Sequence, residues 1–232
     1  FMPYHMIRTC LVLCLILAGN QLQASSHLPE NVGFYYGQEA PIGALYGFDW
    51  LVLQQDQATD ARIDLLHKGG TLPLSYISIG EIARSHRHFR DVPERWKLGE
   101  NKAWKSTVLD LRLPEVRQFI LDRLIAPGIN RGFQGLFLDT LDSHLLTSEG
   151  KAQPEAFSAS QASLLESIRN RWPDTKIIIN RGFHLPESSH GLIDALAFES
   201  WSAGYDVRRN GYPRVSEQDQ SWLKPQLDHW RS

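Results

Sequence analysis

Acidic side chains end several apolar segments of this sequence, where a strand that only packs would not need them. Residues 135–144 read GLFLDTLDSH, so an apolar run leads directly into Asp139, and a second carboxylate, Asp142, follows three residues later. Other apolar runs end on polar residues in the same way: Glu81, Asn180 followed by Arg181, and Glu199. Several carboxylates buried near one another are costly unless their charges are paired or used. The repetition therefore indicates a chemical site at the strand ends.

Two carboxylates on either side of a substrate are the minimum apparatus for hydrolysing a glycosidic bond. One acts as acid and base, and the other stabilises or attacks the oxocarbenium-like centre. The proximity of like charges raises the pKa of one group, which keeps that group protonated near neutral pH. We predict that Asp139 and Glu199 form this pair. The structural alternatives are that Asp139 caps a following helix and that Glu199 pairs with Arg181.

A further set of side chains, at or just past the predicted strand ends, is expected to bind the substrate. Aromatic rings among them suit the C–H faces of sugars. The predicted binding residues are Glu81, Asp142, Tyr36, Tyr76, Asn180, Arg181, Trp201 and Tyr205. Structural alternatives exist for some of these residues. Glu81 could pair with Arg84 across a helical turn, and Asp142 could cap a loop. Asn180 and Arg181 could hold the carboxylates in place rather than touch the substrate.

A metal site is the alternative use of the same segment. Asp139, Asp142 and His144 form the spacing D-x-x-D-x-H, which is suggestive of metal ligands. The sequence has no second histidine cluster with convincing metal spacing. We therefore interpret His144 as a solvated loop histidine and predict neither a metal nor another cofactor.

The elements that must position these residues alternate along the chain. Predicted strands cover residues 33–37, 48–54, 72–80, 135–139, 176–180 and 195–200, and predicted helices cover 58–70, 113–132, 153–172 and 217–230. Residues 84–105 are polar, basic and aromatic and are predicted to be a long loop. Alternation of helices with nearly continuous apolar strands predicts an α/β fold with a parallel sheet. In such a sheet all carboxyl ends of the strands lie on one face, so the acidic residues should converge.

A TIM (β/α)8-type barrel and an open doubly wound sheet both fit this pattern. No G-x-G-x-x-G motif follows the first predicted strand, which weakens a dinucleotide-binding interpretation. A barrel typically needs about 250 residues. With about six strands in 232 residues, we expect a barrel truncated after the sixth strand.

The N-terminal segment is predicted to direct the chain out of the cytoplasm. Residues 6–26 combine a basic start, a short apolar run and an Ala24 cleavage position, which is typical of a secretory signal peptide over residues 1–24. Phe precedes the first Met, so we expect residues 1–5 to be non-native upstream sequence. Residues 25–232 would then form a barrel domain without cysteine, since both cysteines, Cys10 and Cys14, precede the cleavage position. The alternative is an uncleaved N-terminal anchor.

Four motifs carry a family resemblance. SIGE, GLFLDTLD, INRGF and FESWS occur in this order, and together they resemble glycoside hydrolase family 166, the PelA-type hydrolase domains, and its relative family 114, the endo-α-1,4-polygalactosaminidases. The resemblance implies a TIM-barrel endo-hydrolase that cleaves partly deacetylated α-1,4-linked N-acetylgalactosamine polymers, the Pel-type biofilm exopolysaccharide, without a metal. It also implies a periplasmic location in a Gram-negative bacterium. It assigns Asp139 as the nucleophile and Glu199 as the acid/base, with exchanged roles as the alternative.

The expected partners follow from the same reasoning. They are the polysaccharide substrate and other components of exopolysaccharide export, without stable membrane insertion after signal cleavage. The formal net charge of −2 gives no reason to expect nucleic acid as a partner. Three other functions stay open at this point: a non-catalytic polysaccharide-binding barrel, a metal-dependent polysaccharide hydrolase or deacetylase, and a structural scaffold within an export complex.

Overall fold

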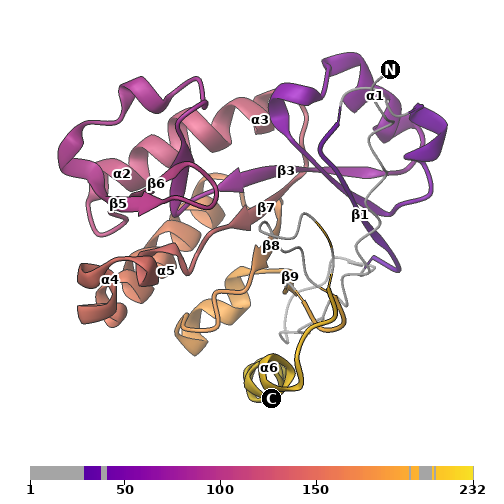
Figure 1. Ribbon diagram of the computed structural model, residues 1–232. Coiled ribbons are helices and arrows are strands. Elements are labelled where there is room, and N and C mark those ends of the chain that lie inside the picture. The colour runs from indigo at the N-terminus through magenta and orange to yellow at the C-terminus, as the bar shows by residue number, and fades with distance from the viewer. Residues whose placement is uncertain (1–28, 38–40, 199, 204–210, 212, 232) are drawn as a thin grey trace.

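The main architectural feature is a parallel sheet that forms half of a barrel-like wall, with helices around its outer side (Figure 1). The computed structural model describes residues 29–37, 41–198, 200–203, 211 and 213–231. Within this part of the chain the sheet has six strands: β1 (Val32–Tyr35), β2 (Trp50–Leu53), β3 (Leu72–Ser78), β7 (Gly135–Asp139), β8 (Lys176–Asn180) and β9 (Ala195–Ala197). Each strand pairs in parallel with the next one in chain order. A doubly wound sheet would reverse its order at a switch point, so the structure has the barrel type of winding.

The predicted helices are present, one of them in altered form. The helices are α1 (Asp60–Lys68), α2 (Pro114–Phe119), α3 (Ala126–Asn130), α4 (Ser148–Ala152), α5 (Pro154–Arg171) and α6 (Glu217–Arg231). The single helix expected over residues 113–132 is divided, because a π-helical turn, Ile120–Ile125, separates α2 from α3. Pro127 follows this turn and has no N–H group to donate to the preceding turn. A local change to i→i+5 bonding accommodates that missing donor.

Apolar side chains cover both faces of the parallel sheet. Alternate residues on the outer face, such as Leu138 and Ile179, pack into one cluster with helix residues such as Leu165 of α5. The inner face carries a second cluster: Trp50, Val52, Leu74, Phe137, Ile178, Ala195 and Ala197. Burial on both faces is characteristic of parallel sheets. Asp139 and Asn180 follow Phe137 and Ile178 by two positions and so continue the inner face to its carboxyl edge.

A second, smaller sheet was not expected from the sequence. Strands β4 (Glu81–Ala83), β5 (Lys97–Asn101) and β6 (Ser106–Leu109) form an antiparallel sheet in the order β4-β6-β5. The prediction that residues 84–105 form one long loop is therefore wrong. The KLGEN segment of β5 has weak strand propensity of its own, and its pairing with β6 supplies the missing stabilisation. The small sheet continues directly from the end of β3, where Leu109 donates its N–H to the Gly80 carbonyl at 2.9 Å.

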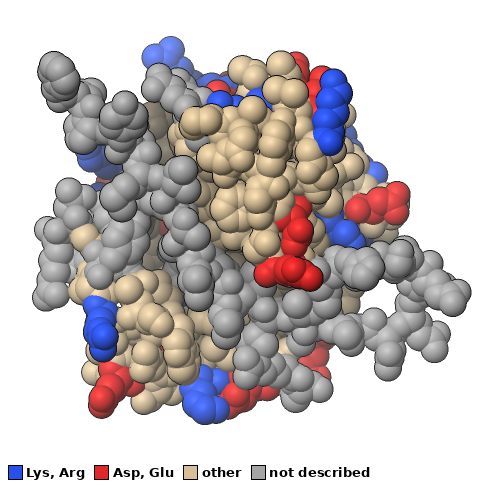
Figure 2. All heavy atoms as spheres, turned by 90° about the vertical axis from the view of Figure 1, so that its right-hand side faces the viewer, with Lys and Arg blue, Asp and Glu red and all other residues tan. Residues whose placement is uncertain are grey.

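No helix in the described part of the chain is long and apolar enough to cross a membrane. The predicted signal peptide, with both cysteines, lies outside the described residues. On the face shown in Figure 2, the coloured acidic and basic side chains are interspersed.

Candidate active site

The Asp139 carboxylate is held in a fixed orientation at the carboxyl edge of the sheet. The Tyr76 hydroxyl donates to Asp139 Oδ2 at 2.5 Å, Asn180 Nδ2 donates to Oδ1 at 3.0 Å, and the Thr140 N–H donates to Oδ1 at 2.7 Å. These donors come from the strands on either side of β7 and from the loop that follows it. A side chain held by three donors is pre-organised for chemistry. The convergence of strand ends predicted from the sequence is thus present for Tyr76, Asp139 and Asn180.

An aromatic wall lies below this carboxylate on the inner face. Phe137 contacts Tyr76 at a ring-centroid distance of 6.1 Å and Phe34 at 5.1 Å. Tyr36 packs edge-on against Tyr76 at 5.4 Å, and 41% of its surface is exposed. The exposed ring of Tyr36 lies next to the hydroxyl-bearing ring that holds Asp139. This placement suits a flat ligand face such as that of a sugar ring.

Two residues with unfavourable backbone conformations follow the site residues directly. Thr140, after Asp139, has φ of 67°, and Arg181, after Asn180, has φ of 62°. Residues other than glycine rarely adopt this left-handed region, and a β-branched threonine least of all. The Thr140 hydroxyl offsets part of the cost, because it accepts from the Gly80 N–H at 2.9 Å and donates to the Asp139 carbonyl at 2.6 Å. Strain of this kind concentrates at functional sites.

Arg181 and Asp142 form an ion pair with each other next to Asp139. Arg181 Nη1 donates to Asp142 Oδ2 at 3.1 Å, and more than a third of each side chain is exposed. The carboxylate of Asp142 therefore lies at the accessible rim of the site. No side-chain capping hydrogen bond from Asp142 is present at the following turn, Ser143–Leu146. The alternative that Asp142 only caps the loop is not supported.

Glu81, predicted to bind the substrate, is buried among hydrogen-bond partners from the small sheet and the loop after β7. Its side chain is only 4% exposed, at the start of β4. One carboxylate oxygen accepts from Asn101 Nδ2 at 2.9 Å and from the Ser143 hydroxyl at 2.5 Å, and the other accepts from the Ser106 hydroxyl. The suggested pairing with Arg84 is also absent, because Arg84 pairs with Glu100. Glu81 joins the small sheet to the loop after β7 and has no free face for a sugar.

Three predicted site residues lie at or beyond the end of β9. Glu199, the predicted second carboxylate, and Tyr205 lie outside the described residues. Trp201 is 41% exposed, and its carbonyl accepts from Gln220 Nε2 of α6 at 2.7 Å. The structure thus places Trp201 close to the first turns of α6.

His144 is a buried residue, which corrects its interpretation as a solvated loop histidine. It is 3% exposed and stacks on Phe157 at a centroid distance of 4.7 Å. Its Nδ1–H donates to the Leu141 carbonyl at 3.1 Å, and Nε2 is buried without a partner. Asp142 meanwhile pairs with Arg181, so the D-x-x-D-x-H side chains turn to different neighbours. No cluster of three potential metal ligands occurs among the residues that the structure describes.

A hydrogen-bond relay that sequence reasoning missed supports the same loop. Gln161 Nε2 donates to the Leu141 carbonyl at 2.5 Å, which leaves Gln161 Oε1 to accept from His184 Nε2–H at 2.7 Å. Burial lowers the pKa of His184 from 6.5 to about 4; nearby His144 lowers it further and Asp142 opposes the shift. His184 is therefore neutral at pH 7. No motif or spacing signals this relay, because its members come from three separate segments.

We expect acid to destabilise the protein through His184. Between pH 6.5 and 4 the unfolded histidine binds a proton and the folded one does not, so the free energy of unfolding falls as the pH falls. One pKa unit corresponds to about 1.4 kcal/mol, which gives a loss of about 3 kcal/mol over this range. Urea unfolding at pH 7.0, 5.5 and 4.5 measures the slope. His184→Gln should be less stable at pH 7 but should lose less stability on acidification; a slope equal to that of the wild type would contradict the assignment.

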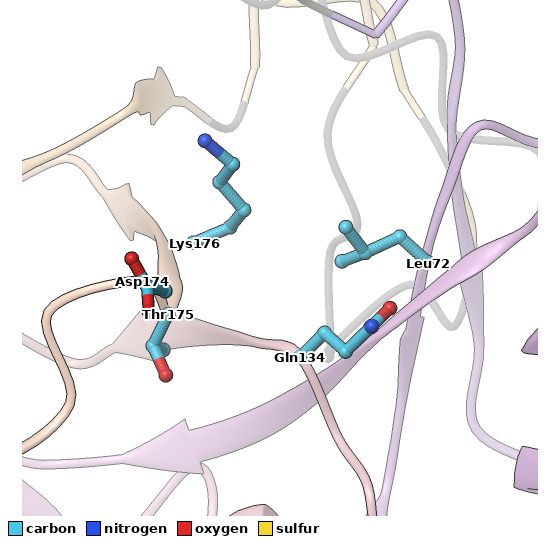
Figure 3. Close-up of a pocket in the computed structure, with 5 residues that line it drawn as sticks. All are labelled: Leu72, Gln134, Asp174, Thr175 and Lys176. Atoms are coloured by element: carbon cyan, nitrogen blue, oxygen red, sulfur yellow. The ribbon is translucent and has the colours of Figure 1, made fainter. Parts of the chain in front are cut away.

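The cavity shown in Figure 3 lies at the opposite end of the strands. Its lining residues come from the starts of β3 and β8 and from the segments before β7 and β8: Leu72, Gln134, Asp174, Thr175 and Lys176. Lys176 Nζ also pairs with Asp194 at 3.2 Å. None of the predicted site residues that the structure describes lies among those that line this cavity. The chemistry is therefore assigned to the carboxyl edge.

Comparisons with solved structures agree with this geometry. The fold matches the glycoside hydrolase domain of PelA from Pseudomonas aeruginosa with a TM-score of 0.79 and 35% identity, over 87% of this chain and 79% of that one. It also matches Ega3 from Aspergillus fumigatus, solved with galactosamine, with a TM-score of 0.59 and 16% identity, over 76% of this chain and 70% of that one. The second likeness is one of fold alone.

Sequence comparison gives the family. A curated relative, an uncharacterized protein of Methanocaldococcus jannaschii, is 30% identical over 135 residues, which are 52% of this chain and 37% of that protein. The match therefore spans little more than a third of the relative's length. The model of glycoside hydrolase family GH114 matches residues 18–223, which include every predicted site residue. With the barrel-type sheet and the acidic carboxyl edge, this match shows that the chain belongs to glycoside hydrolase family GH114.

Proposed function

We propose that this protein is an endo-acting glycoside hydrolase that cleaves partly deacetylated α-1,4-linked N-acetylgalactosamine polysaccharide by a two-carboxylate mechanism. The observation that carries the proposal is the Asp139 carboxylate, held by three donors at the carboxyl edge of a GH114 sheet. The substrate class is supported by the likeness to the PelA hydrolase domain and by the sequence motifs shared with that group. The aromatic wall beside Asp139 supports a sugar ligand.

The proposed mechanism uses Asp139 as nucleophile and Glu199 as acid and base. Asp139 attacks the anomeric carbon while Glu199 protonates the departing glycosidic oxygen, and Glu199 then takes a proton from the water that releases the sugar. Donors on both oxygens of Asp139 orient it and stabilise it as an acceptor, which suits a nucleophile better than a proton donor. Glu199 is proposed as the partner from its sequence position, two residues after Ala197, the last residue of β9.

Hydrolysis of a partly deacetylated α-1,4-galactosamine polymer tests the proposal, with and without EDTA. Wild type should release shortened oligomers at the same rate in both conditions, and Glu199→Gln should abolish release. Inhibition by EDTA that added metal reverses would favour the metal-dependent alternative instead. Binding of the polymer without cleavage would favour a binding barrel.

Tyr76→Phe should lower kcat by roughly 10- to 100-fold, with a smaller effect on KM. The variant removes the hydroxyl that donates to Asp139 Oδ2 but keeps the ring that packs on Phe137. Loss of one pre-organised donor to a reacting group has an effect of this order or somewhat larger. Steady-state kinetics on the polymer measures it. Tyr46→Phe is the matched control, because the Tyr46 ring lies against Gly69 at the end of α1; equal kcat values for the two variants would contradict a role for the Tyr76 hydroxyl.

We also propose that the protein works in the periplasm, on polysaccharide handled by export components. The proposal rests on the signal-like composition of residues 6–26. N-terminal sequencing of protein from the periplasmic fraction should give a chain that begins at Ser25. Recovery of the uncut chain from the cytoplasm would contradict it.

A further inference from the structure

A partly exposed tryptophan on α6 lies beside the site without belonging to the predicted set. Trp222 is 53% exposed, whereas its neighbours on the same helix, Leu223, Leu227 and Trp230, are buried. The Arg181 guanidinium lies over the indole ring, 5.8 Å from its centroid, and Phe183 approaches it edge-on at 6.0 Å. Both contacts come from the segment that follows β8. The indole is therefore held in place while much of it still faces solvent.

Trp222 is connected to the reacting carboxylate by a short chain of contacts. Arg181 bonds to Asp142 at 3.1 Å, and the residue before it, Asn180, donates to Asp139 at 3.0 Å. Trp201 lies on the same side, tied to α6 through Gln220. Two exposed tryptophans thus border the carboxyl edge, beyond the rim formed by Arg181 and Asp142. Exposed tryptophans positioned next to a site are characteristic of binding surfaces.

We propose that Trp222 is a platform for one sugar ring of the polymer, outside the two units that share the cleaved bond. The inference rests on the proposed function and extends it to a distal subsite. The open part of the indole would pack against the C–H face of a hexosamine ring. The Arg181 guanidinium and the Asp142 carboxylate, both more than a third exposed, would donate to and accept from its polar groups. Such a platform explains why an enzyme acting within a chain would keep this large apolar ring in water.

Binding without turnover tests the platform. Affinity for the partly deacetylated α-1,4-galactosamine polymer is measured by calorimetry with an inactive Asp139→Asn background, alone and combined with Trp222→Ala, Trp222→Phe or Trp104→Ala. Trp104 is the matched control, because it is 61% exposed and lies between β5 and β6, in the small sheet. Trp222→Ala should weaken binding by about tenfold and Trp222→Phe by less, since the smaller ring still stacks. Trp104→Ala should not weaken binding.

Chain length separates a platform from a general loss of fold. For the Asp139→Asn protein, affinity should rise as oligomers become long enough to reach Trp222, and this rise should flatten in the Trp222→Ala form. Equal affinities of the Trp222→Ala and Trp104→Ala proteins would overturn the platform. In that case cleavage of the polymer by wild type would leave the proposed function standing, whereas absence of both binding and cleavage would overturn both.

Discussion

Asp139→Asn should reduce the rate of polymer hydrolysis by at least ~10³-fold, with little change in the fold. The amide keeps the shape of the side chain but removes the negative charge that attacks or stabilises the oxocarbenium-like centre. Loss of a group that acts on the reacting atoms has effects of this size. Release of reducing ends measures the rate, and circular dichroism checks the fold.

The partners of Asp139 make this variant informative. Tyr76, Asn180 and the Thr140 N–H all donate to the carboxylate. An asparagine in the same place has only one acceptor oxygen, so at least one of these donors loses its partner. We therefore expect a modest cost of about 1–2 kcal/mol in the free energy of unfolding. Asp174→Asn is the matched control, since Asp174 is exposed at the opposite edge of the sheet. Comparable activity of the two variants would remove Asp139 from the mechanism.

The sequence predicted the part of the site that depends on strand ends. Asp139 and Asn180 both end apolar runs, and parallel pairing alone suffices to bring such ends together. Tyr76 was predicted at the site as a substrate contact, and it lies there. Its hydrogen bond to Asp139 depends on the length of the phenol reaching along the strand edge, which no pattern in the sequence specifies.

The structural features that the sequence did not predict depend on tertiary contacts between loops. Glu81 looked like the end of a strand, but the chain turns at Gly80 into a second sheet. A Cβ atom on Gly80 would lie only 2.1 Å from the Thr140 carbonyl oxygen, so the two loops cross too closely for any other residue. The sequence LPLSYISIG, which is typical of a single strand, gives no sign of this close approach. His144 and His184 likewise lie edge-to-face at a ring-centroid distance of 5.0 Å, although they are far apart in the sequence. Gln161 of α5 links the same segments, because it bonds both to the Leu141 carbonyl in the loop after β7 and to His184.

The side-chain amide of Asn180 shows why local rules are broken at this edge. Its Nδ2 donates to Asp139, and its Oδ1 is buried without a hydrogen-bond partner. An unpaired buried acceptor costs free energy, and a reversed amide would place oxygen against the carboxylate. The orientation of Asp139 therefore comes at the expense of stability, as do the left-handed Thr140 and Arg181 that follow these strands. Sequence reasoning that assumes satisfied, unstrained elements is least accurate at such places.

Glu81→Ala should lower the free energy of unfolding by about 3–4 kcal/mol, the largest expected effect on stability. The substitution leaves Asn101, Ser106 and Ser143 without their shared acceptor in a buried setting. Glu81→Gln keeps one acceptor oxygen and the volume, so about half of that loss is expected. Urea unfolding measures both variants. Glu100→Ala is the control from the same small sheet, because its exposed pair with Arg84 should contribute less than about 1 kcal/mol.

The same variants decide between a structural and a substrate-binding Glu81. Ser143, which lies in the same loop as Asp142, donates a hydrogen bond to the Glu81 carboxylate. Asn101 and Ser106 of the small sheet also donate to this carboxylate. If Glu81 is purely structural, the folded Glu81→Gln protein should keep the KM of the wild type. It should lose activity only under conditions in which it unfolds. A stable Glu81→Gln protein with a raised KM would instead return Glu81 to the binding site. It would also mean that the small sheet opens when the polymer binds, since the carboxylate is otherwise inaccessible.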